Sequence, residues 1–321
     1  MAIEIIEPGL AASIQDQGRP GYYNVGIPPS GALDLFSAAA ANVLVGNPSD
    51  AAVLESTYMG PKLRFTDDTV VAVTGADIPV KINGHTVPMW ESFPVKTGDE
   101  LSFGILEQGA RMYVAVAGGF AVPEVLGSRS LYALGAFGGF EGRTLKTGDL
   151  LPTGTAVGTI GRVLPNDLRP QLSREVDIRV VIGLYDYRLT DKGLSALLDQ
   201  PWQLTTVADR IGFRYSGHSL DWKERKQPFG AGSDPSNITD AGYPIGSIQV
   251  PGGIEPIILH RDAVSGGGYA MVATVISADL DVVAQCSPGT QTRFRPVSLE
   301  DALEARALAK ERRKRLLTLA D

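Results

Sequence analysis

Apolar residues along this chain recur mainly in short runs that alternate with polar residues and stop at glycine or proline. Alternation with a period of two is typical of a β-strand with one buried face. The first run, Ile3 to Ile14, is broken at Pro8-Gly9 and predicts two strands joined by a turn. Similar runs predict strands at 63–65, 70–74, 80–82, 177–182, 203–207, 247–250, 256–259 and 269–276. The pattern therefore predicts a mainly β fold.

A few segments have helical spacing instead. Ala32 to Val45 is rich in Ala and Leu and ends at Gly46-Asn47, which predicts a helix with a glycine stop. A shorter helix is expected near 190–198. Near the C-terminus, Ser298-Leu-Glu-Asp301 has the spacing of a capping box, and the residues to Leu319 place acids early and basic residues late. That order predicts a terminal helix.

Turn motifs repeat along the chain. Asn83-Gly84 between alternating residues predicts a hairpin. The tetrapeptide Lys-Thr-Gly-Asp occurs at 96–99 and again at 146–149, and Ser287-Pro-Gly-Thr290 precedes another strand-like run. Repeated units of a turn and a strand suggest related β modules.

A crowd of Pro, Asn and Asp between about Gly154 and Glu175 marks a change in composition. We expect a domain boundary there, which divides the chain into residues 1–165, residues 166–297 and a C-terminal helix at 298–321. A Gly/Pro/Ser-rich loop is expected from Gln227 to Gly242.

Charge and composition exclude several classes of protein. A net charge of −7 at pH 7 disfavours nucleic acid and anionic lipid surfaces as partners. The single cysteine, Cys286, cannot form an internal disulfide. The acidic N-terminal segment does not resemble an export signal. The longest uncharged run, Met112 to Pro123, is shorter than the roughly 20 residues that cross a bilayer. We expect a soluble, cytoplasmic protein.

Several catalytic motifs are missing from the sequence. It has no phosphate-binding loop of the Walker type, no dinucleotide fingerprint and no serine elbow. The three histidines and Cys286 lack the spacing of a zinc site, so we expect no metal. No Met-Lys-Met turn is present to carry biotin, so any biotin is expected to arrive on a partner.

Many ordered blocks between residues 3 and 295 resemble one family. They include Ile14-Gln-Asp-Gln-Gly-Arg19, Gly26-Ile-Pro-Pro-Ser-Gly-Ala-Leu-Asp34, Leu54-Glu55, Thr74-Gly-Ala-Asp77, Leu126-Gly-Ser-Arg-Ser130, Gly138-Gly-Phe-Glu-Gly-Arg143, Asp209-Arg-Ile-Gly212, Gly246-Ser-Ile-Gln-Val-Pro251 and Gln285-Cys-Ser-Pro-Gly289. These blocks are similar to the biotin-dependent carboxyltransferase-like family, which includes one of the subunits of 5-oxoprolinase and the carboxyltransferase region of urea carboxylase.

The resemblance implies two cyclophilin-like β-barrel domains, a carboxyltransferase-like one in the first half and a second one from residue 166 to 297. It also implies a companion carboxyltransferase-like subunit of the 5-oxoprolinase type, with a further subunit or a biotin carboxylase as another candidate partner. ATP or carboxybiotin would come with that partner, and no cofactor would be bound covalently to this chain. The substrate would be a small cyclic amide or urea-like compound, opened with ATP or carboxylated. The segment Asp234 to Asp240 resembles the urea-carboxylase branch, whereas Gln249-Val-Pro251 resembles the oxoprolinase branch, so the two reactions stay open. The alternative is a regulatory protein without turnover that counters a kinase inhibitor through partner contact.

Both reactions place negative charge on a carbonyl oxygen, which preorganised polar groups must stabilise. Polar residues in the Gly-rich blocks suit that task, because arginine binds carboxylates in bidentate fashion and amides match a urea or lactam edge. The predicted catalytic residues are Asp34, Arg143 and Asp240. The predicted substrate-binding residues are Gln15, Asp16, Arg19, Ser30, Asn42, Arg129, Asn237, Gln249, Tyr269 and Gln285.

A purely structural role is the alternative for most of these residues. The arginines could brace loops through backbone carbonyls, Asp34 could serve only the start of its helix, and Asn237 could shape a turn. The site also requires that polar loops from both halves of the chain meet in one cleft.

Overall fold

The computed structural model describes residues 1–226 and 229–319. The chain divides into two compact units, and each is built from more than one segment. The first unit comprises Met1–Arg19, Ser30–Leu172 and the C-terminal residues from Lys310, and the second comprises Pro20–Pro29 and Ser173–Ala309. The change between the units at 172/173 lies a few residues beyond the boundary expected at 165/166. The sequence did not predict that residues 20–29 group with the second unit, or that the C-terminal residues from Lys310 group with the first.

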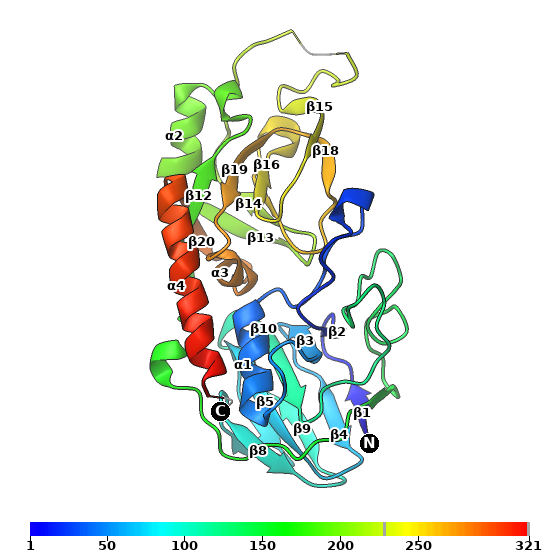
Figure 1. Ribbon diagram of the computed structural model, residues 1–321. Helices are drawn as coiled ribbons and strands as arrows, with labels where there is room; N and C mark the ends of the chain where they lie inside the picture. Colours follow the sequence, from blue (N-terminus) through cyan, green and yellow to red (C-terminus); the bar gives the residue numbers. More distant parts are fainter. Residues whose placement is uncertain (227–228, 320–321) are drawn as a thin grey trace. The chain divides into compact units, whose positions relative to one another are not determined.

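The first unit contains two sheets and helix α1 (Leu35–Val45) (Figure 1). The six-stranded sheet has the order β11 (Leu150–Pro152), β1 (Ala2–Glu7), β4 (Lys62–Phe65), β9 (Glu100–Phe103), β6 (Val80–Ile82) and β7 (His85–Val87). The five-stranded sheet has the order β2 (Ser13–Gln15), β3 (Val53–Thr57), β10 (Gln108–Val116), β5 (Thr69–Asp77) and β8 (Ser92–Val95). The expected hairpin at Asn83-Gly84 is confirmed as the antiparallel pair β6 and β7.

The five-stranded sheet is buried on both faces. Leu54 and Val114 point toward the six-stranded sheet and join its apolar core. Their chain neighbours Val53, Tyr113 and Ala115 point the other way and pack against helix α1 (Leu35–Val45). This alternation creates three layers in the first unit, in the order sheet, sheet and helix.

Helix α1 begins three residues later than expected and ends as predicted. The Asp34 side chain caps it by accepting the Ser37 N–H at 2.9 Å. Gly46 closes it in the left-handed conformation, with φ of 86°. Every residue after Leu35 is buried, because small alanines let the helix sit close against the sheet.

The three repeated turns share one hydrogen-bond pattern. In Lys96–Asp99, Lys146–Asp149 and Ser287–Thr290, the glycine N–H donates to a strand carbonyl at 2.8 Å, and the same strand residue donates its N–H back to the last carbonyl of the turn. Those strand residues are Phe65, Ile5 and Leu204, respectively. Each turn then leads into a strand, namely β9, β11 and β20. The repeat is therefore structural.

The second unit contains a closed barrel. Its strand order is β12 (Glu175–Ile182), β19 (Met271–Val275), β16 (Ser247–Gln249), β17 (Ile257–Leu259), β14 (Gly212–Ser216), β13 (Trp202–Ala208) and β20 (Gln291–Pro296). A separate ribbon pairs β15 (Asn237–Gly242) with β18 (Gly266–Tyr269). The end of the loop expected at 227–242 is thus a strand, and its residues 227 and 228 lie outside the described part. The mainly β fold class is confirmed.

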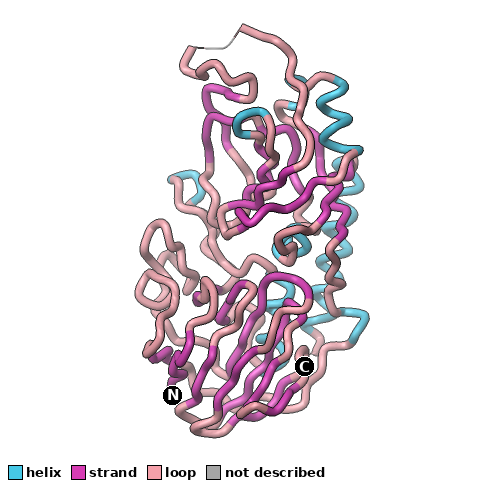
Figure 2. The backbone as a smooth tube through the Cα atoms, turned by 180° about the vertical axis from the view of Figure 1, so that it is seen from behind, coloured by secondary structure: helices cyan, strands magenta, loops and turns pink. Residues whose placement is uncertain are grey.

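The remaining helices are short, apart from the last (Figure 2). They are α2 (Asp191–Asp199), α3 (Leu280–Ala284) and α4 (Leu299–Leu317), with 3-10 turns at Tyr23–Val25, Asn166–Leu168, Asp186–Arg188 and Pro251–Gly253. The capping box is confirmed, since Asp301 N–H donates to Ser298 Oγ at 3.0 Å and Ser298 N–H donates to Asp301 Oδ2 at 3.2 Å. Of the C-terminal segment expected at 298–321, residues 320 and 321 lie outside the described part. Among the described helices, none combines the length and apolarity needed to span a bilayer.

Candidate functional site

The face of the five-stranded sheet that packs against α1 also carries buried polar residues, which lie beside the segment that leads into this helix. Ser13 and Gln15 of β2 project from the same face as Glu55 of β3 and Tyr113 of β10, because strand residues two apart share a face. Glu55 pairs with Ser13 on one side and with Tyr113 on the other. All four side chains are buried. We call Ser13, Gln15, Asp34, Glu55 and Tyr113 the Glu55 cluster.

The Glu55 carboxylate is the acidic centre of this cluster. It is 2% exposed, and its Oε2 accepts the Leu33 N–H at 2.8 Å and the Tyr113 hydroxyl at 2.9 Å. The Tyr113 oxygen accepts the Asp34 N–H at 2.8 Å. Burial raises the pKa of Tyr113 well above its ordinary value, and the nearby Glu55 and Asp34 carboxylates add to this shift. Tyr113 therefore stays protonated and acts as a donor to Glu55.

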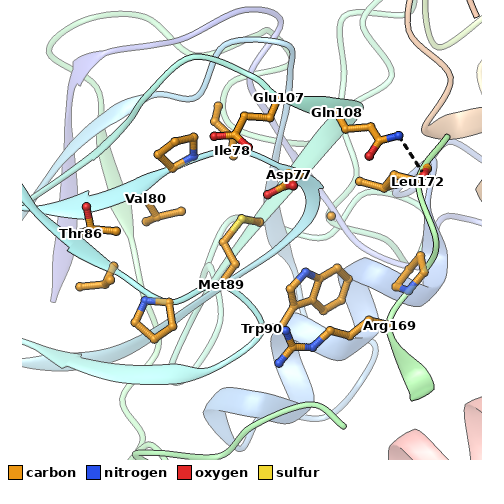
Figure 3. Close-up of a pocket in the computed structure, with 15 residues that line it drawn as sticks. Asp77, Ile78, Val80, Thr86, Met89, Trp90, Glu107, Gln108, Arg169 and Leu172 are labelled. Atoms are coloured by element: carbon orange, nitrogen blue, oxygen red, sulfur yellow. Dashed lines mark hydrogen bonds between the residues drawn. The ribbon is translucent and has the colours of Figure 1, made fainter. Parts of the chain in front are cut away.

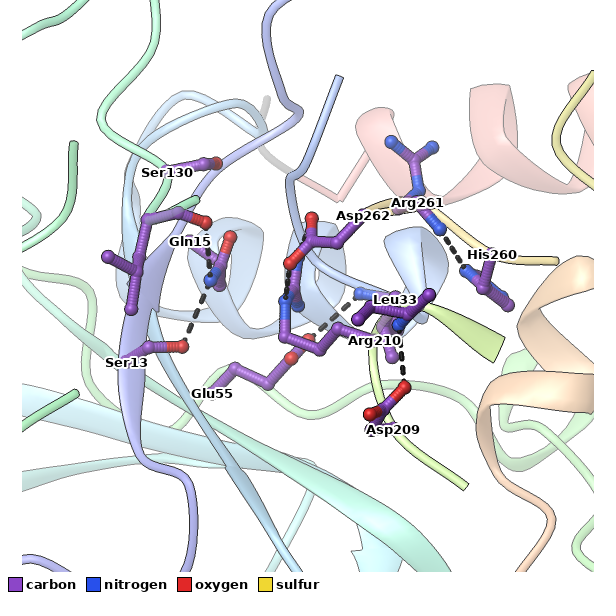
Figure 4. A network of polar contacts seen from close by, with 12 residues as sticks. Ser13, Gln15, Leu33, Glu55, Ser130, Asp209, Arg210, His260, Arg261 and Asp262 are labelled. Atoms are coloured by element: carbon purple, nitrogen blue, oxygen red, sulfur yellow. Dashed lines mark hydrogen bonds and ion pairs between the residues drawn. The ribbon is translucent and has the colours of Figure 1, made fainter. Parts of the chain in front are cut away.

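Gln15 provides a buried acceptor beside this carboxylate (Figure 4). Its Nε2 donates to Ser13 Oγ at 2.9 Å and to the Leu131 carbonyl at 3.4 Å. Its Oε1 has no hydrogen-bond donor within the described residues. A buried oxygen without a donor is costly unless a ligand supplies one. Gln15 Oε1 is therefore an unused acceptor enclosed by the protein.

Asp16 and its partners form a second group, next to the first along the chain. Asp16 Oδ1 accepts the hydroxyls of Ser128 and Ser130, each at 2.6 Å, and its Oδ2 accepts the Arg129 N–H at 2.5 Å. Arg19 is 1% exposed, donates to the Ser130 carbonyl and lies over the Phe137 ring at 5.0 Å. These contacts hold the loop around Ser130 against the end of β2.

The Arg129 side chain braces the same loop. Its Nε donates to the Val122 carbonyl at 2.9 Å, and its Nη1 pairs with Glu124 at 2.7 Å. The structure therefore brings together four predicted residues of the first unit, namely Gln15, Asp16, Arg19 and Arg129.

The other predicted residues of the first unit have mainly local contacts. Asn42 Nδ2 donates to the Ala51 carbonyl at 2.7 Å, which braces the connection after α1. Ser30 is buried with a positive φ of 52°. Arg143 forms a bidentate ion pair with Asp149, at 2.8 Å for each bond, and also pairs with Glu141 at 2.6 Å. The pair with Asp149 raises the pKa of Arg143 and lowers that of Asp149.

In the second unit, Asn237 and Tyr269 face each other across the β15–β18 ribbon. The Asn237 carbonyl accepts Arg188 Nη1 at 2.8 Å and Arg225 Nη2 at 2.6 Å. Asn237 Oδ1 is buried and has no donor within the described residues. The Tyr269 N–H donates to the Tyr243 hydroxyl at 2.7 Å. Asn237 thus resembles Gln15 in presenting a buried amide oxygen.

Three predicted residues of the second unit lie elsewhere. Asp240 is exposed on β15, and Gln249 is half-buried on β16. Gln285 is buried at the end of α3. Their roles, and the meeting of both halves in one cleft, stay predictions.

Glu55 and Tyr113 were missed as candidates, although Glu55 lies in one of the motifs noted above. The signal was weak: Glu55 directly follows the apolar pair Val53-Leu54, where a buried carboxylate would be unusual. In the second unit, the motif that begins at Asp209 places Arg210 in an ion pair with Asp262, with Nε and Oδ2 at 2.8 Å (Figure 4).

Across the described ranges, no group of three or more His, Cys, Asp or Glu side chains is arranged to hold a metal ion.

Comparison with known proteins identifies the relatives of this chain. Residues 25–296 match the family model described as carboxyltransferase domain, subdomain A and B. Urea amidolyase of Saccharomyces cerevisiae is 35% identical over 311 residues, which cover 94% of this chain and 17% of that protein. A 5-oxoprolinase subunit of Escherichia coli is 34% identical over 308 residues, which cover 95% of this chain and 94% of that protein.

Among solved structures, a urea amidolyase is again similar to this chain. Urea amidolyase of K. lactis matches with a TM-score of 0.93 and 36% identity over 99% of this chain and 20% of that chain. The chain therefore spans a small part of the urea amidolyases and nearly the whole of the 5-oxoprolinase subunit.

Proposed function

Because the chain belongs to the family of carboxyltransferase domains, subdomains A and B, we propose that it is an enzyme subunit that carboxylates a small urea-like substrate in a complex with partner subunits. The observation that carries the proposal is the Glu55 cluster, where a buried carboxylate lies on the same face as a buried amide oxygen that lacks a donor. A urea-like compound has N–H groups next to a carbonyl, which suits this arrangement.

The cluster also fits the ureido ring of biotin, because that ring carries an N–H group that Gln15 Oε1 can accept. Carboxybiotin, delivered by a partner, supplies the activated carboxyl group. In this proposal Gln15 orients the substrate N–H. The substrate nitrogen bonds to the carboxyl carbon as the bond from that carbon to the biotin nitrogen breaks. Glu55 takes the proton that the substrate nitrogen loses and returns it to the biotin nitrogen. Tyr113, which stays protonated, donates to Glu55 and holds the carboxylate in place.

A second candidate reaction is the ATP-dependent opening of a cyclic amide. The match to nearly the full length of a 5-oxoprolinase subunit favours it. A lactam also has an N–H next to a carbonyl, so the same cluster would bind it, and ATP would be held by the companion subunit.

The test uses the chain purified with its companion subunits. Incorporation of labelled bicarbonate that depends on urea or a guanidine supports carboxyl transfer, whereas ATP hydrolysis that depends on 5-oxoproline supports the second reaction. Glu55→Gln and Gln15→Leu should each reduce turnover by about a hundredfold or more. The matched controls Glu7→Gln and Gln171→Leu change exposed residues of the same unit and should leave turnover unchanged.

A complex that shows neither activity with any lactam, urea or guanidine would contradict the enzyme proposal. Full turnover in Glu55→Gln, with an unchanged melting temperature, would contradict the role given to the cluster.

A further inference from the structure

The first unit contains a pocket that the proposed reaction does not use. Its volume is about 620 Å³, within the range of ligand sites, and all its walls belong to the first unit. It lies between the hairpin β6–β7, the end of β5 and the segment 169–172 (Figure 3). The motif Thr74-Gly-Ala-Asp77, for which the proposed function gives no role, ends in its wall.

The walls are fixed by backbone contacts. The Trp90 N–H donates to the Val73 carbonyl at 2.9 Å, and the Leu164 N–H donates to the Trp90 carbonyl at 2.9 Å. Arg169 Nε donates to the Leu164 carbonyl at 3.1 Å, which places Arg169 near Trp90. Gln108 Nε2 donates to the Leu172 carbonyl at 2.9 Å. The pocket is thus held in shape by the protein itself.

Trp90 presents an unused donor to this pocket. Its side chain lines the pocket although the residue is only 8% exposed. Within the described residues, its indole N–H makes no hydrogen bond. Trp90 also has a positive φ of 62°, which is unusual for a bulky residue and typical of functional sites. An acceptor on a ligand would satisfy the indole.

Charged groups of both signs line the same pocket. Arg169 lies on the Trp90 side, and Asp77 and Glu107 lie together, since the Glu107 N–H donates to the Asp77 carbonyl at 2.9 Å (Figure 3). In the described part of the chain, none of these three charges has an oppositely charged partner within ion-pair distance. Met89 and three prolines supply apolar surface.

We propose that this pocket binds a small amphoteric ligand with a carboxylate at one end, a cationic nitrogen at the other and an apolar body between them. The carboxylate would accept from the Trp90 indole and from Arg169, and the cation would pair with Asp77 and Glu107. The apolar body would lie against Met89 and the prolines. A ligand with a single charge would leave one set of groups unpaired, so an ω-amino acid or a basic amino acid is the class that fits.

The test is calorimetric titration of the whole chain with ω-amino acids of increasing length, together with lysine and arginine. Hexanoate and hexylamine serve as one-charge controls for 6-aminohexanoate. We expect saturable binding of at least one amphoteric compound at or below ~10 mM, and binding of its one-charge analogues that is weaker by about tenfold or more. Tryptophan emission should change with the same saturation curve, and Trp90→Phe should abolish that change.

Variants locate the binding. Asp77→Asn combined with Glu107→Gln should weaken binding by about tenfold or more, as should Arg169→Gln, whereas Arg169→Lys should restore part of it. Asp50→Asn, which changes an exposed carboxylate of the same unit, is the matched control and should have no effect. Melting temperatures of all variants separate lost binding from lost folding. The proposal is overturned if no amphoteric compound binds, if one-charge analogues bind equally well, or if binding survives in folded Asp77 and Arg169 variants.

Discussion

Tyr113→Phe is the most direct test of the Glu55 cluster, because it removes one oxygen atom and little volume. That oxygen takes part in two buried hydrogen bonds. It accepts from the Asp34 N–H at 2.8 Å and donates to Glu55 Oε2 at 2.9 Å. Phenylalanine would keep the packing of the ring and lose both bonds.

The expected cost follows from these two contacts. A buried N–H left without an acceptor costs about 1–3 kcal/mol, and a hydrogen bond to a charged group contributes about 1.5–3 kcal/mol. Together the loss is about 2.5–6 kcal/mol. Since ~1 kcal/mol shifts the melting temperature of a unit of this size by ~2–4 °C, we expect a fall of roughly 5–24 °C.

Denaturant unfolding of the wild type, Tyr113→Phe, Glu55→Gln and the double variant provides the assay. The double-mutant cycle should give a coupling of about 1–2 kcal/mol, because the two side chains share a hydrogen bond. Tyr187→Phe, at a residue that is 62% exposed, is the control and should change stability by less than ~0.5 kcal/mol. A cost below ~1 kcal/mol for Tyr113→Phe, or independent effects in the cycle, would refute the assigned hydrogen bonds.

Further predictions follow from backbone strain, from burial and from the ion pair of Arg143. Gly118 and Gly148 share a φ of 86°, but a Cβ at Gly118 would lie 2.6 Å from backbone atoms, whereas nothing lies within 4 Å at Gly148. Denaturation should therefore show a cost of about 1 kcal/mol for Gly148→Ala and several times more for Gly118→Ala, and equal costs would contradict this account. Burial raises the pKa of Tyr113 and Tyr215 above 10.0. The stability that their protonated forms contribute is therefore fully present below pH 10 and is lost as pH rises further. In a phenolate absorbance titration these two tyrosines should ionise only as the chain unfolds. Arg143→Ala removes a bidentate ion pair and should cost about 1 kcal/mol; full turnover of the complex in this variant would remove Arg143 from the predicted catalytic residues.

Local patterns were good guides to local structure. Alternating runs marked most of the strands, Asn83-Gly84 marked a hairpin, and the serine and acid near residue 300 marked the start of a helix. These features depend on a few neighbouring residues, so a single sequence carries them. The start of α1 was misplaced by three residues because Asp34, inside the apolar run, serves as its cap.

The candidate site was predicted only in part. Gln15, Asp16, Arg19 and Arg129 do gather, and the Gly-rich blocks that contain them pointed to this region. Glu55 was overlooked because its burial depends on which face of β3 meets α1. The pocket beside Trp90 was also not predicted, since its walls come from strands and a linker far apart in the chain.

By itself, the sequence determined the mainly β class, the hairpin and repeated turns, the capping box of the last helix and the family, because each is written in short patterns or in ordered motifs. Only the tertiary structure decided which polar residues share a buried surface, that residues 20–29 belong with the second unit, and that Trp90 lines a pocket with charges of both signs. The physical reason is that strand pairing joins residues far apart in the chain, such as Ser13 with Glu55 and Glu55 with Tyr113, and no local pattern specifies such partners.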